Sequence, residues 1–232
     1  MCGRFTATFE FREIKLRWNI QRDLEFAPRY NIAPSQNVPV IVKGESGYEA
    51  QLMKWGLVPF WAPDPSIGNR MINARAETLM EKSSFKRLVE TRRCLVPADG
   101  FFEWQRDGNR KFPMLIRLKN KEPFTFAGLW DSWRNPQLPE EVLNTFTIIT
   151  TDPNSMLRKI HNRMPVIYDQ PMGKSWLEGV ASTMMLNAVL RPWPSEYMLA
   201  HEVSKMVNAP ANDRAECIAP VSGGQILDGQ DY

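Results

Sequence analysis

The sequence predicts an α+β fold: one domain whose antiparallel β-sheet curls into a barrel-like core, with helices at the periphery. Three observations support this prediction. Strand-like runs separated by polar turns dominate the middle of the chain, helical periodicity is confined to a few segments, and no repeat or linker divides the sequence. A length of 232 residues is enough for one large core. We therefore expect a single domain over residues 1–232, with the last residues, about ten, as a flexible tail.

The N-terminal third predicts one helix and three strands. Residues 8–18 place apolar side chains among charged ones, which is typical of a short amphipathic helix. Residues 38–44 and 48–59 have strand-like patterns and flank Glu45-Ser46-Gly47, so they indicate a hairpin. Residues 72–78 indicate a further strand.

The middle of the chain predicts a helix followed by a meander of strands. Residues 81–93 have a helical pattern, with Ser83 or Ser84 near the start. Antiparallel strands separated by polar turns are then expected over residues 94–106, 111–119 and 124–133.

Strands and helices alternate toward the C-terminus. Residues 144–151 predict a strand, and residues 153–160 predict a short helix that Pro153 can begin. A longer helical stretch follows Pro171 and runs to residue 190. Strand-like pieces are expected at 203–209 and 215–221, before a Gly-rich end.

The composition excludes several classes of protein. No apolar stretch approaches the roughly 20 residues that span a bilayer, and no secretory h-region is visible, so we expect a cytoplasmic protein without a membrane partner. Three cysteines without a CxxC pair and two histidines without an HExxH motif predict no disulfide framework, metal site or cofactor. The net charge of +3 is weakly basic. Clusters such as Arg158-Lys159 near Arg163 can follow phosphates, although a solvated surface is the alternative for each.

Cys2 is the most informative residue of the chain. Once Met1 is removed, it carries a thiol and an α-amine whose ordinary pKa values are about 8.5 and about 7.7–8.0. Such an aminothiol condenses with an aldehyde, because the amine forms an imine and the thiol closes it into a five-membered thiazolidine. The alternative is that a small residue at position 2 only permits trimming of Met1.

Four segments place reactive polar residues where a buried strand or tight turn favours apolar ones. They are RYNIAPSQ (29–36), INARAE (72–77), ADGFFEW (98–104) and HNRMP (161–165). In a strand over INARAE, Asn73, Arg75 and Glu77 would share one face, because residues two apart point the same way.

Glu103 and His161 are the candidates for proton transfer. Glu103 lies between Phe102 and Trp104, and apolar neighbours would raise its pKa toward neutrality. The alternative is an exposed strand glutamate between inward-facing aromatics. His161 suits a proton donor or acceptor, or else a histidine that caps a helix C-terminus.

Most of the chain resembles one known family. The strings MCGRF, RYNIAPSQ, MKWGLVPFW, INARAET, FKRLVETRRCLVPADGFFEW, FTFAGLWDSW, TIITTDPN and HNRMPVI occur in the order found in the SOS-response-associated peptidase family. The tail HEVSKMVNAPANDRAECIAPV is also similar. The resemblance implies the fold of that family and a monomeric protein of the SOS response to DNA damage.

The resemblance also implies a reaction and a set of residues. After loss of Met1, by self-cleavage or by an aminopeptidase, Cys2 would react with the aldehyde of an abasic site in single-stranded DNA and form a stable thiazolidine crosslink. Asn73 would hold the N-terminus, Glu103 would shuttle protons, and His161 would assist opening of the sugar ring. The implied DNA contacts are Arg4, Arg75, Thr150 and Arg163, with Pro34 and Trp61 as a wedge against duplex DNA.

Two other functions are compatible with parts of the sequence. A non-catalytic module for single-stranded or modified-base DNA would bind reversibly, and Cys2 would be incidental. An N-terminal-nucleophile amidotransferase also often starts Met-Cys-Gly, but its Arg-Trp-Ala-Thr-type and Asn-Gly-Asp-type segments are not found here.

Overall fold

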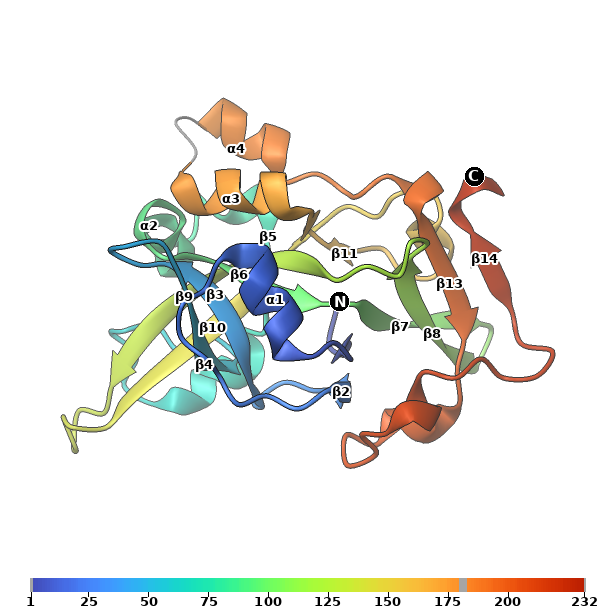
Figure 1. Ribbon diagram of the computed structural model, residues 1–232, viewed down its shortest axis with the longest axis horizontal. Coiled ribbons are helices and arrows are strands. Elements are labelled where there is room, and N and C mark those ends of the chain that lie inside the picture. Colours follow the sequence, from blue (N-terminus) through green and yellow to red (C-terminus); the bar gives the residue numbers. More distant parts are fainter. Residues whose placement is uncertain (1, 180–182, 232) are drawn as a thin grey trace.

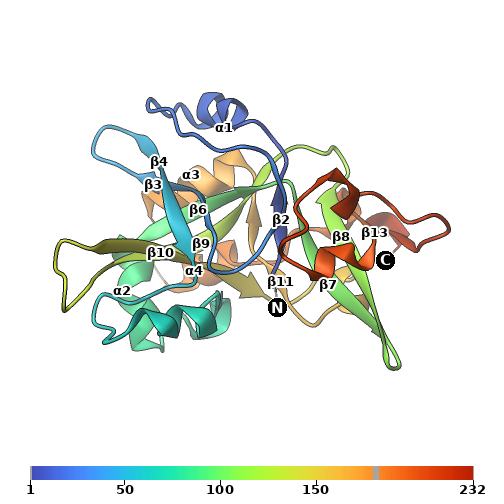
Figure 2. The same ribbon diagram turned by 90° about the horizontal axis from the view of Figure 1, so that it is seen from below.

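The strands fall into two sheets, and the N-terminal end of the chain lies between them (Figures 1 and 2). The computed structural model describes residues 2–179 and 183–231; Met1, residues 180–182 and Tyr232 are outside this description. One sheet has the order β14 (Ile226–Asp228), β13 (Met198–Glu202), β8 (Arg110–Leu118), β7 (Gly100–Asp107), β1 (Phe5–Ala7) and β2 (Arg29–Ile32).

The second sheet closes on itself. Its order is β11 (Met164–Pro165), β10 (Val142–Thr151), β4 (Tyr48–Trp55), β3 (Asn37–Lys43), β6 (Arg93–Ala98), β9 (Phe124–Arg134) and β12 (Ile167–Tyr168). Because β10 pairs with both β4 and β9, the path β4-β3-β6-β9-β10 forms a ring. The barrel-like core and the α+β class are therefore confirmed.

Helices cover the outside of this ring. They are α1 (Phe11–Trp18), α2 (Ser83–Thr91), α3 (Gln170–Glu178) and α4 (Thr183–Val189), and α3 and α4 lie together above the barrel in Figure 1. None of the helices in the described part of the chain has the length and apolarity needed to cross a membrane.

Local patterns located several elements correctly. The hairpin expected around Glu45-Ser46-Gly47 is β3–β4, with Lys43 opposite Tyr48. The helices expected over 8–18 and 81–93 contain α1 and α2, which bury the apolar side of each pattern. The strand expected at 144–151 is the main part of β10.

Sheet assignment and strand direction differ from the expectation. Residues 94–106 form two strands in different sheets, β6 and β7, because the chain turns a corner at Asp99. Asp99 fixes this corner by accepting hydrogen bonds from the Thr6 and Thr8 hydroxyls. Most strand pairs are antiparallel as expected, but β10 runs parallel to β4 and to β5 (Asn73–Arg75).

Several C-terminal expectations are corrected as well. Residues 153–160 contain only a 3₁₀ turn, Leu157–Lys159. Residues 203–209 and 215–221 form 3₁₀ turns, Lys205–Asn208 and Ala215–Cys217, instead of strands. The helical stretch after Pro171 is divided into α3 and α4, and its residues 180–182 lie outside the described residues. Residues 226–228 are not a loose tail, because β14 pairs with β13.

Candidate active site

Cys2 is fully buried and lies three residues before β1, a strand of the six-stranded sheet. The amide Nδ2 of Asn73 donates a hydrogen bond to the Cys2 carbonyl at 2.8 Å, and the thiol contacts the Arg4 carbonyl at 3.9 Å. Burial raises the pKa of the Cys2 thiol far above its ordinary value, and the negative charge of Glu103 raises it further. The thiol is therefore protonated at rest and needs a base before it can act as a nucleophile.

Glu103 supplies a titratable group of the right pKa. It lies on β7, is only 3% exposed, and burial raises its pKa to about 7. The apolar neighbours in the sequence predicted this direction. A carboxyl group that titrates near neutral pH can both donate and accept a proton in one reaction cycle.

His161 lies beside Glu103. Its Nδ1 is 4.0 Å from Glu103 Oε1 and accepts a hydrogen bond from the Arg163 backbone N–H at 3.1 Å. The same Nδ1 lies 3.4 Å from the Arg163 carbonyl, but the shorter contact identifies Nδ1 as an acceptor, so the proton is on Nε2. Burial lowers the pKa of His161, and the positive charges of Arg106 and Arg163 also lower it.

Asn73 is positioned near Cys2 by β5, which pairs with β10 directly after the point where β4 stops pairing with it. Trp55 ends β4 beside Phe146 of β10, and after a detour the chain returns with Asn73 beside Ile148. The Trp55 indole donates to the Ile72 carbonyl at 2.9 Å, which fixes the return. Asn73 Oδ1 is buried and has no hydrogen-bond partner among the described residues, so one acceptor beside the Cys2 backbone is available.

The strand of INARAE is shorter than expected. β5 ends at Arg75, and Ala76–Thr78 form a 3₁₀ turn. Glu77 therefore does not continue the face of Asn73. It forms a bidentate pair with Arg163, with both N–O distances 2.9 Å.

The residues implied as DNA contacts fall into two groups. Arg75 is exposed. Arg4 is buried and donates to Asn31 Oδ1 and the Val207 carbonyl at 2.7 and 2.6 Å. Arg163 is also buried, and besides Glu77 it donates to Asp152 at 3.0 Å and to the carbonyl of Thr150, whose side chain is fully buried, at 2.6 Å. The roles of these residues in binding stay predictions.

Trp61 lies on a loop that is held rigidly. It is 50% exposed and its neighbour Phe60 is 57% exposed. Every second residue of this loop is fixed to β9 or β10 by a hydrogen bond. The Val58 N–H donates to Thr145 Oγ1 at 2.8 Å, and the Phe60 N–H donates to Asp131 Oδ2 at 3.0 Å. Trp133 Nε1 donates to the Ala62 carbonyl at 2.7 Å. The loop therefore presents its aromatic side chains without needing to order on binding.

The start of this loop requires glycine. Gly56 has φ +123°, and a Cβ there would lie 2.6 Å from the Gly68 carbonyl oxygen.

The sequence patterns did not single out Asp131 or Phe60. The only signal was an acidic residue inside the apolar strand FTFAGLWDSW.

Pro34 lies on the turn after β2 and is partly buried. Ser35 follows it with φ 70°, and its N–H donates to the Trp55 carbonyl at 2.8 Å. The turn is thus fastened to the residue from which the aromatic loop departs.

The C-terminal segment is fastened to β2 by Asn31, which belongs to the segment RYNIAPSQ, and by Asp213, which the sequence patterns did not single out. Asn31 Nδ2 donates to the carbonyl of Asn212 at 2.6 Å, and Asp213 Oδ1 accepts from the N–H groups of Tyr30 and Asn31 at 2.6 and 2.9 Å. RYNI therefore organises the fold around Arg4 instead of contributing a catalytic group.

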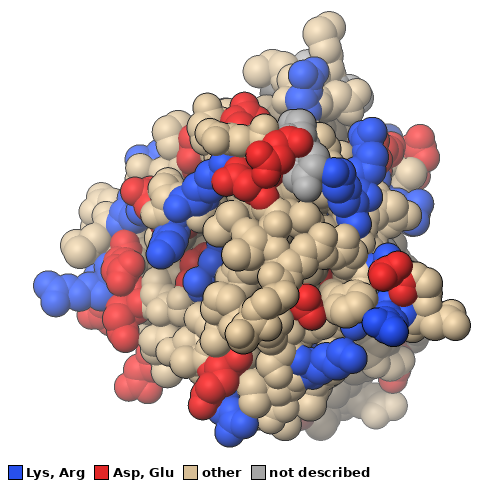
Figure 3. Space-filling view, turned by 90° about the vertical axis from the view of Figure 1, so that its right-hand side faces the viewer, with Lys and Arg blue, Asp and Glu red and all other residues tan. Residues whose placement is uncertain are grey.

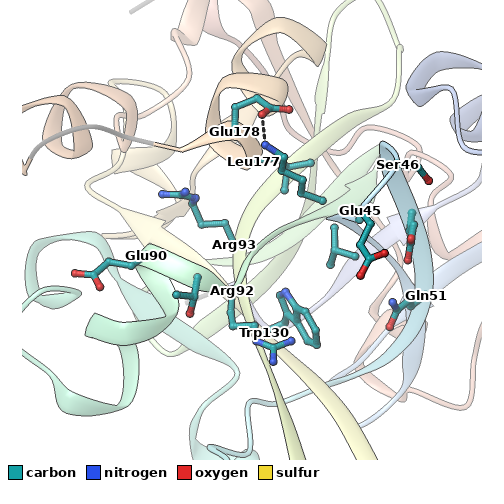
Figure 4. A pocket seen from close by; sticks show the side chains of 14 residues that line it. Glu45, Ser46, Gln51, Glu90, Arg92, Arg93, Trp130, Leu177 and Glu178 are labelled. Carbon is teal, nitrogen blue, oxygen red and sulfur yellow. Dashed lines mark hydrogen bonds and ion pairs between the residues drawn. The ribbon is translucent and has the colours of Figure 1, made fainter.

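Charges are mixed over much of the surface. On the face shown in Figure 3, Lys and Arg are scattered among Asp and Glu around a central area of uncharged residues. A cleft of about 780 Å³ lies at the start of β6, lined by Arg92, Trp130 and several glutamates (Figure 4). It contains none of the residues that converge on Cys2.

Comparisons with known proteins place the chain among relatives. Residues 1–210 match the model of the family "SOS response associated peptidase (SRAP)". The chain is 45% identical to the abasic site processing protein YoqW of Bacillus subtilis, covering 94% of this chain and 99% of that protein. It is 34% identical to the abasic site processing protein HMCES of Gallus gallus, covering 88% and 69%.

A solved structure has the same fold. A protein from Bacteroides thetaiotaomicron superposes with a TM-score of 0.87 at 28% identity, covering 95% of this chain and 100% of that one. The fold, the family match and the relatives together show that the chain belongs to the SOS response associated peptidase family.

Proposed function

We propose that this protein processes abasic sites by forming a covalent thiazolidine crosslink between Cys2 and single-stranded DNA. The relatives named abasic site processing proteins support the substrate class. The observation that carries the chemistry is a buried thiol whose backbone is held by Asn73, beside a carboxyl group with a pKa of about 7.

The reaction balances with the groups of this site. The α-amine of mature Cys2 attacks the C1′ aldehyde, and Glu103 in its acid form protonates the hydroxyl that leaves as water, giving a protonated imine. The thiol then adds to the imine carbon, and its proton passes to the Glu103 carboxylate, so that the ring nitrogen keeps one hydrogen and is neutral. The product is a thiazolidine, and Glu103 returns to its starting state.

Asn73 and His161 orient the reactants in this proposal. Asn73 Nδ2 holds the Cys2 carbonyl, and the unused Oδ1 can accept a hydrogen bond from the α-amine. His161 carries its proton on Nε2 and can donate it to the sugar hydroxyl that ring opening releases.

Met1 must leave before the amine is available, and Met1 lies outside the described residues. We propose hydrolysis assisted by Glu103, because thiol attack on the preceding carbonyl would pass through a strained small ring. Asn73 serves as an anchor in this step and not as an oxyanion ligand, since its amide binds the Cys2 carbonyl, one residue further along. A host aminopeptidase remains the alternative.

The preference for single strands rests on the aromatic loop and the Pro34 turn. Trp61 offers a stacking surface for bases, and Pro34 lies on the turn fastened to the start of the loop, so together they can block a continuing duplex. Arg75 is the exposed cation nearest to Asn73 on β5 and is the first candidate for a phosphate contact. Arg4, Thr150 and Arg163 act from behind this surface, where they hold its backbone.

Denaturing electrophoresis of the mature protein with an oligonucleotide that carries one abasic site tests the proposal. We expect a heat-stable shifted band with single-stranded DNA and much less with duplex. Cys2→Ala abolishes the band, and Cys2→Ser leaves at most an imine that borohydride traps. Cys217→Ser is the matched control, because that thiol is buried elsewhere.

Two results identify the other functions. Binding that is reversible, sensitive to salt and unchanged in Cys2→Ala would indicate a non-catalytic module. Release of ammonia from glutamine would indicate an amidotransferase.

A further inference from the structure

A tight turn between β4 and the 3₁₀ helix Pro65–Arg70 carries two aromatic side chains. The Ala62 N–H donates to the Pro59 carbonyl at 2.9 Å, so Phe60 and Trp61 occupy the two central positions of a β-turn. Such positions are usually filled by Gly, Pro, Asn, Asp or Ser, because these residues favour the backbone angles of a turn. Turn formation therefore does not account for two large rings at this corner.

The fold buries the neighbours of these rings and leaves the rings exposed. Val58 and Ala62 pack with Trp133 in a small buried cluster. Phe60, in contrast, is 57% exposed and Trp61 is 50% exposed. Adjacent exposed rings on a fixed backbone form an apolar patch, and such patches mark binding sites more often than isolated apolar residues do.

Phe60 is held from one side by Arg87 of α2. The Arg87 guanidinium lies over the Phe60 ring, 4.7 Å from its centroid. Arg87 Nη2 donates to both carboxylate oxygens of Asp131, at 2.9 and 3.1 Å, and Asp131 Oδ2 also accepts from the Phe60 N–H at 3.0 Å. One carboxylate thus fixes the backbone of Phe60 directly and its ring through Arg87, while more than half of the side chain remains exposed.

The charge beside this ring is positive at the surface. The Arg87 side chain is 45% exposed, whereas that of Asp131 is 4% exposed, so solvent meets the cation of this pair. An apolar protein partner would have to remove water from the guanidinium, which costs free energy. A nucleic-acid strand offers flat bases for the ring and phosphates for the cation, and therefore fits both features.

We propose that Phe60 and Arg87 form a second stacking site for a base of the single strand, beside the one proposed for Trp61. The inference rests on the proposed function, since it takes the ligand to be the strand whose abasic residue reaches Cys2. A base on the exposed part of the Phe60 ring would complete a stack of guanidinium, phenyl ring and base. Every base has a flat π-face, so this site tolerates any sequence.

The affinity of a Phe60→Ala variant tests the site. The ligand is single-stranded DNA whose abasic residue is a tetrahydrofuran analogue, which has no aldehyde, so binding stays reversible. We expect binding weaker by about 5–150-fold than that of the parent protein, the range for loss of one base–aromatic stack. The plot of log K against log[salt] should keep its slope, because a neutral ring displaces no counterions.

Tyr197→Ala is the matched control. Tyr197 is also 57% exposed and lies at the end of the 3₁₀ turn Ser195–Tyr197. This variant should bind like the parent. An affinity of Phe60→Ala equal to that of Tyr197→Ala would overturn the site.

Removing further bases one at a time assigns a base to each ring. Oligonucleotides with a second tetrahydrofuran residue at successive positions should weaken binding of the parent at two positions. Phe60→Ala should be insensitive at one of them and Trp61→Ala at the other, because a ring that is absent loses nothing with its base. Equal sensitivity of parent and Phe60→Ala at every position, or insensitivity of both variants at the same position, would overturn a second site.

Arg87→Lys tests the part that the guanidinium takes. Lysine keeps the charge but has no planar group to lie against the ring, so binding should weaken in the parent and not weaken further in Phe60→Ala. An equal loss in both backgrounds would show that Arg87 acts independently of the ring and would remove it from the site.

Crosslinking of the parent to DNA with a true abasic residue separates the two proposals. A crosslink without the loss of affinity in Phe60→Ala means that the second stacking site alone is wrong. The loss of affinity without a crosslink means that Phe60 stacks a base while the covalent function is wrong.

Discussion

Two regions of this molecule contain the same kinds of residue and differ in their chemistry. The cleft of Figure 4 has Arg92 over the ring of Trp130 at 4.2 Å and a rim of glutamates, and the site near Cys2 has Arg4 at 6.0 Å from the ring of Trp104 and one glutamate. In the first, Glu178 is exposed, and hydrogen bonds from Lys43 and Tyr48 hold its pKa below the ordinary value. In the second, burial raises the pKa of Glu103 to about 7.

The difference shows that the kinds of residue present do not by themselves indicate reactivity. The cleft of Figure 4 is open to solvent, and its charges neutralise one another locally. The site at Cys2 is buried, and the free energy needed to ionise a buried carboxyl group is what brings the pKa of Glu103 near neutral pH.

The largest expected effect is on the crosslinking rate, which should depend on Glu103 and not on Glu178. Glu103→Gln should slow crosslinking by about 10²–10⁴-fold, because an amide cannot transfer the proton, while binding of abasic DNA changes little. Glu178→Gln should leave the rate as in the wild type. Single-turnover rates and equilibrium binding, measured for both variants, decide this; equal losses of rate and affinity in Glu103→Gln would assign that residue to binding or folding instead.

The same burial should appear in the stability of the protein. Because the folded pKa of Glu103 lies above its unfolded value, the folded state holds the proton more tightly between about pH 4.5 and pH 7. This group therefore costs no stability below that window and lowers the free energy of unfolding by up to about 3 kcal/mol as the pH rises through it. Urea unfolding of Glu103→Gln should lack this decline, and parallel pH profiles for the two proteins would contradict it.

Arg75 and Arg163, which the sequence predicts as DNA contacts, should differ in their contributions to stability and to binding, by less than the two glutamates differ in rate. Arg163→Ala removes the donor to the buried Thr150 carbonyl and should lower the free energy of unfolding by about 1–3 kcal/mol. Arg75→Ala should leave stability within about 0.5 kcal/mol and flatten the salt dependence of DNA binding. Denaturant titration together with binding at several salt concentrations measures both; a larger stability loss in Arg75→Ala would reverse the assignment.

The smallest effect is expected in the cleft of Figure 4. Arg92→Ala removes a partly exposed cation–π contact with Trp130 and should cost about 0.5–1 kcal/mol of stability. Crosslinking rate and DNA affinity should match the wild type. A change in either would show that this cleft takes part in the function and would remove the contrast between the two regions.

The local sequence was enough to predict the elements whose pattern depends on near neighbours. The β3–β4 hairpin, α1 and α2 were located because their apolar periodicity and turn residues lie within a few positions of each other. The raised pKa of Glu103 was also predictable, since it follows from the apolar residues beside it in the sequence. The shape of the C-terminal segment was not, because its 3₁₀ turns take their form from β2.

Long-range contacts decided the rest. Arg4 and Val207 are 203 positions apart, and Glu77 and Arg163 are 86 apart, yet these contacts determine how two arginines that the sequence predicts as DNA contacts are buried. The strand face predicted for Asn73, Arg75 and Glu77 failed for the same reason, since the ion pair with Arg163 turns Glu77 away. A sequence pattern reports the preference of a segment for burial, whereas the partner that satisfies a buried charge is set only when distant segments pack together.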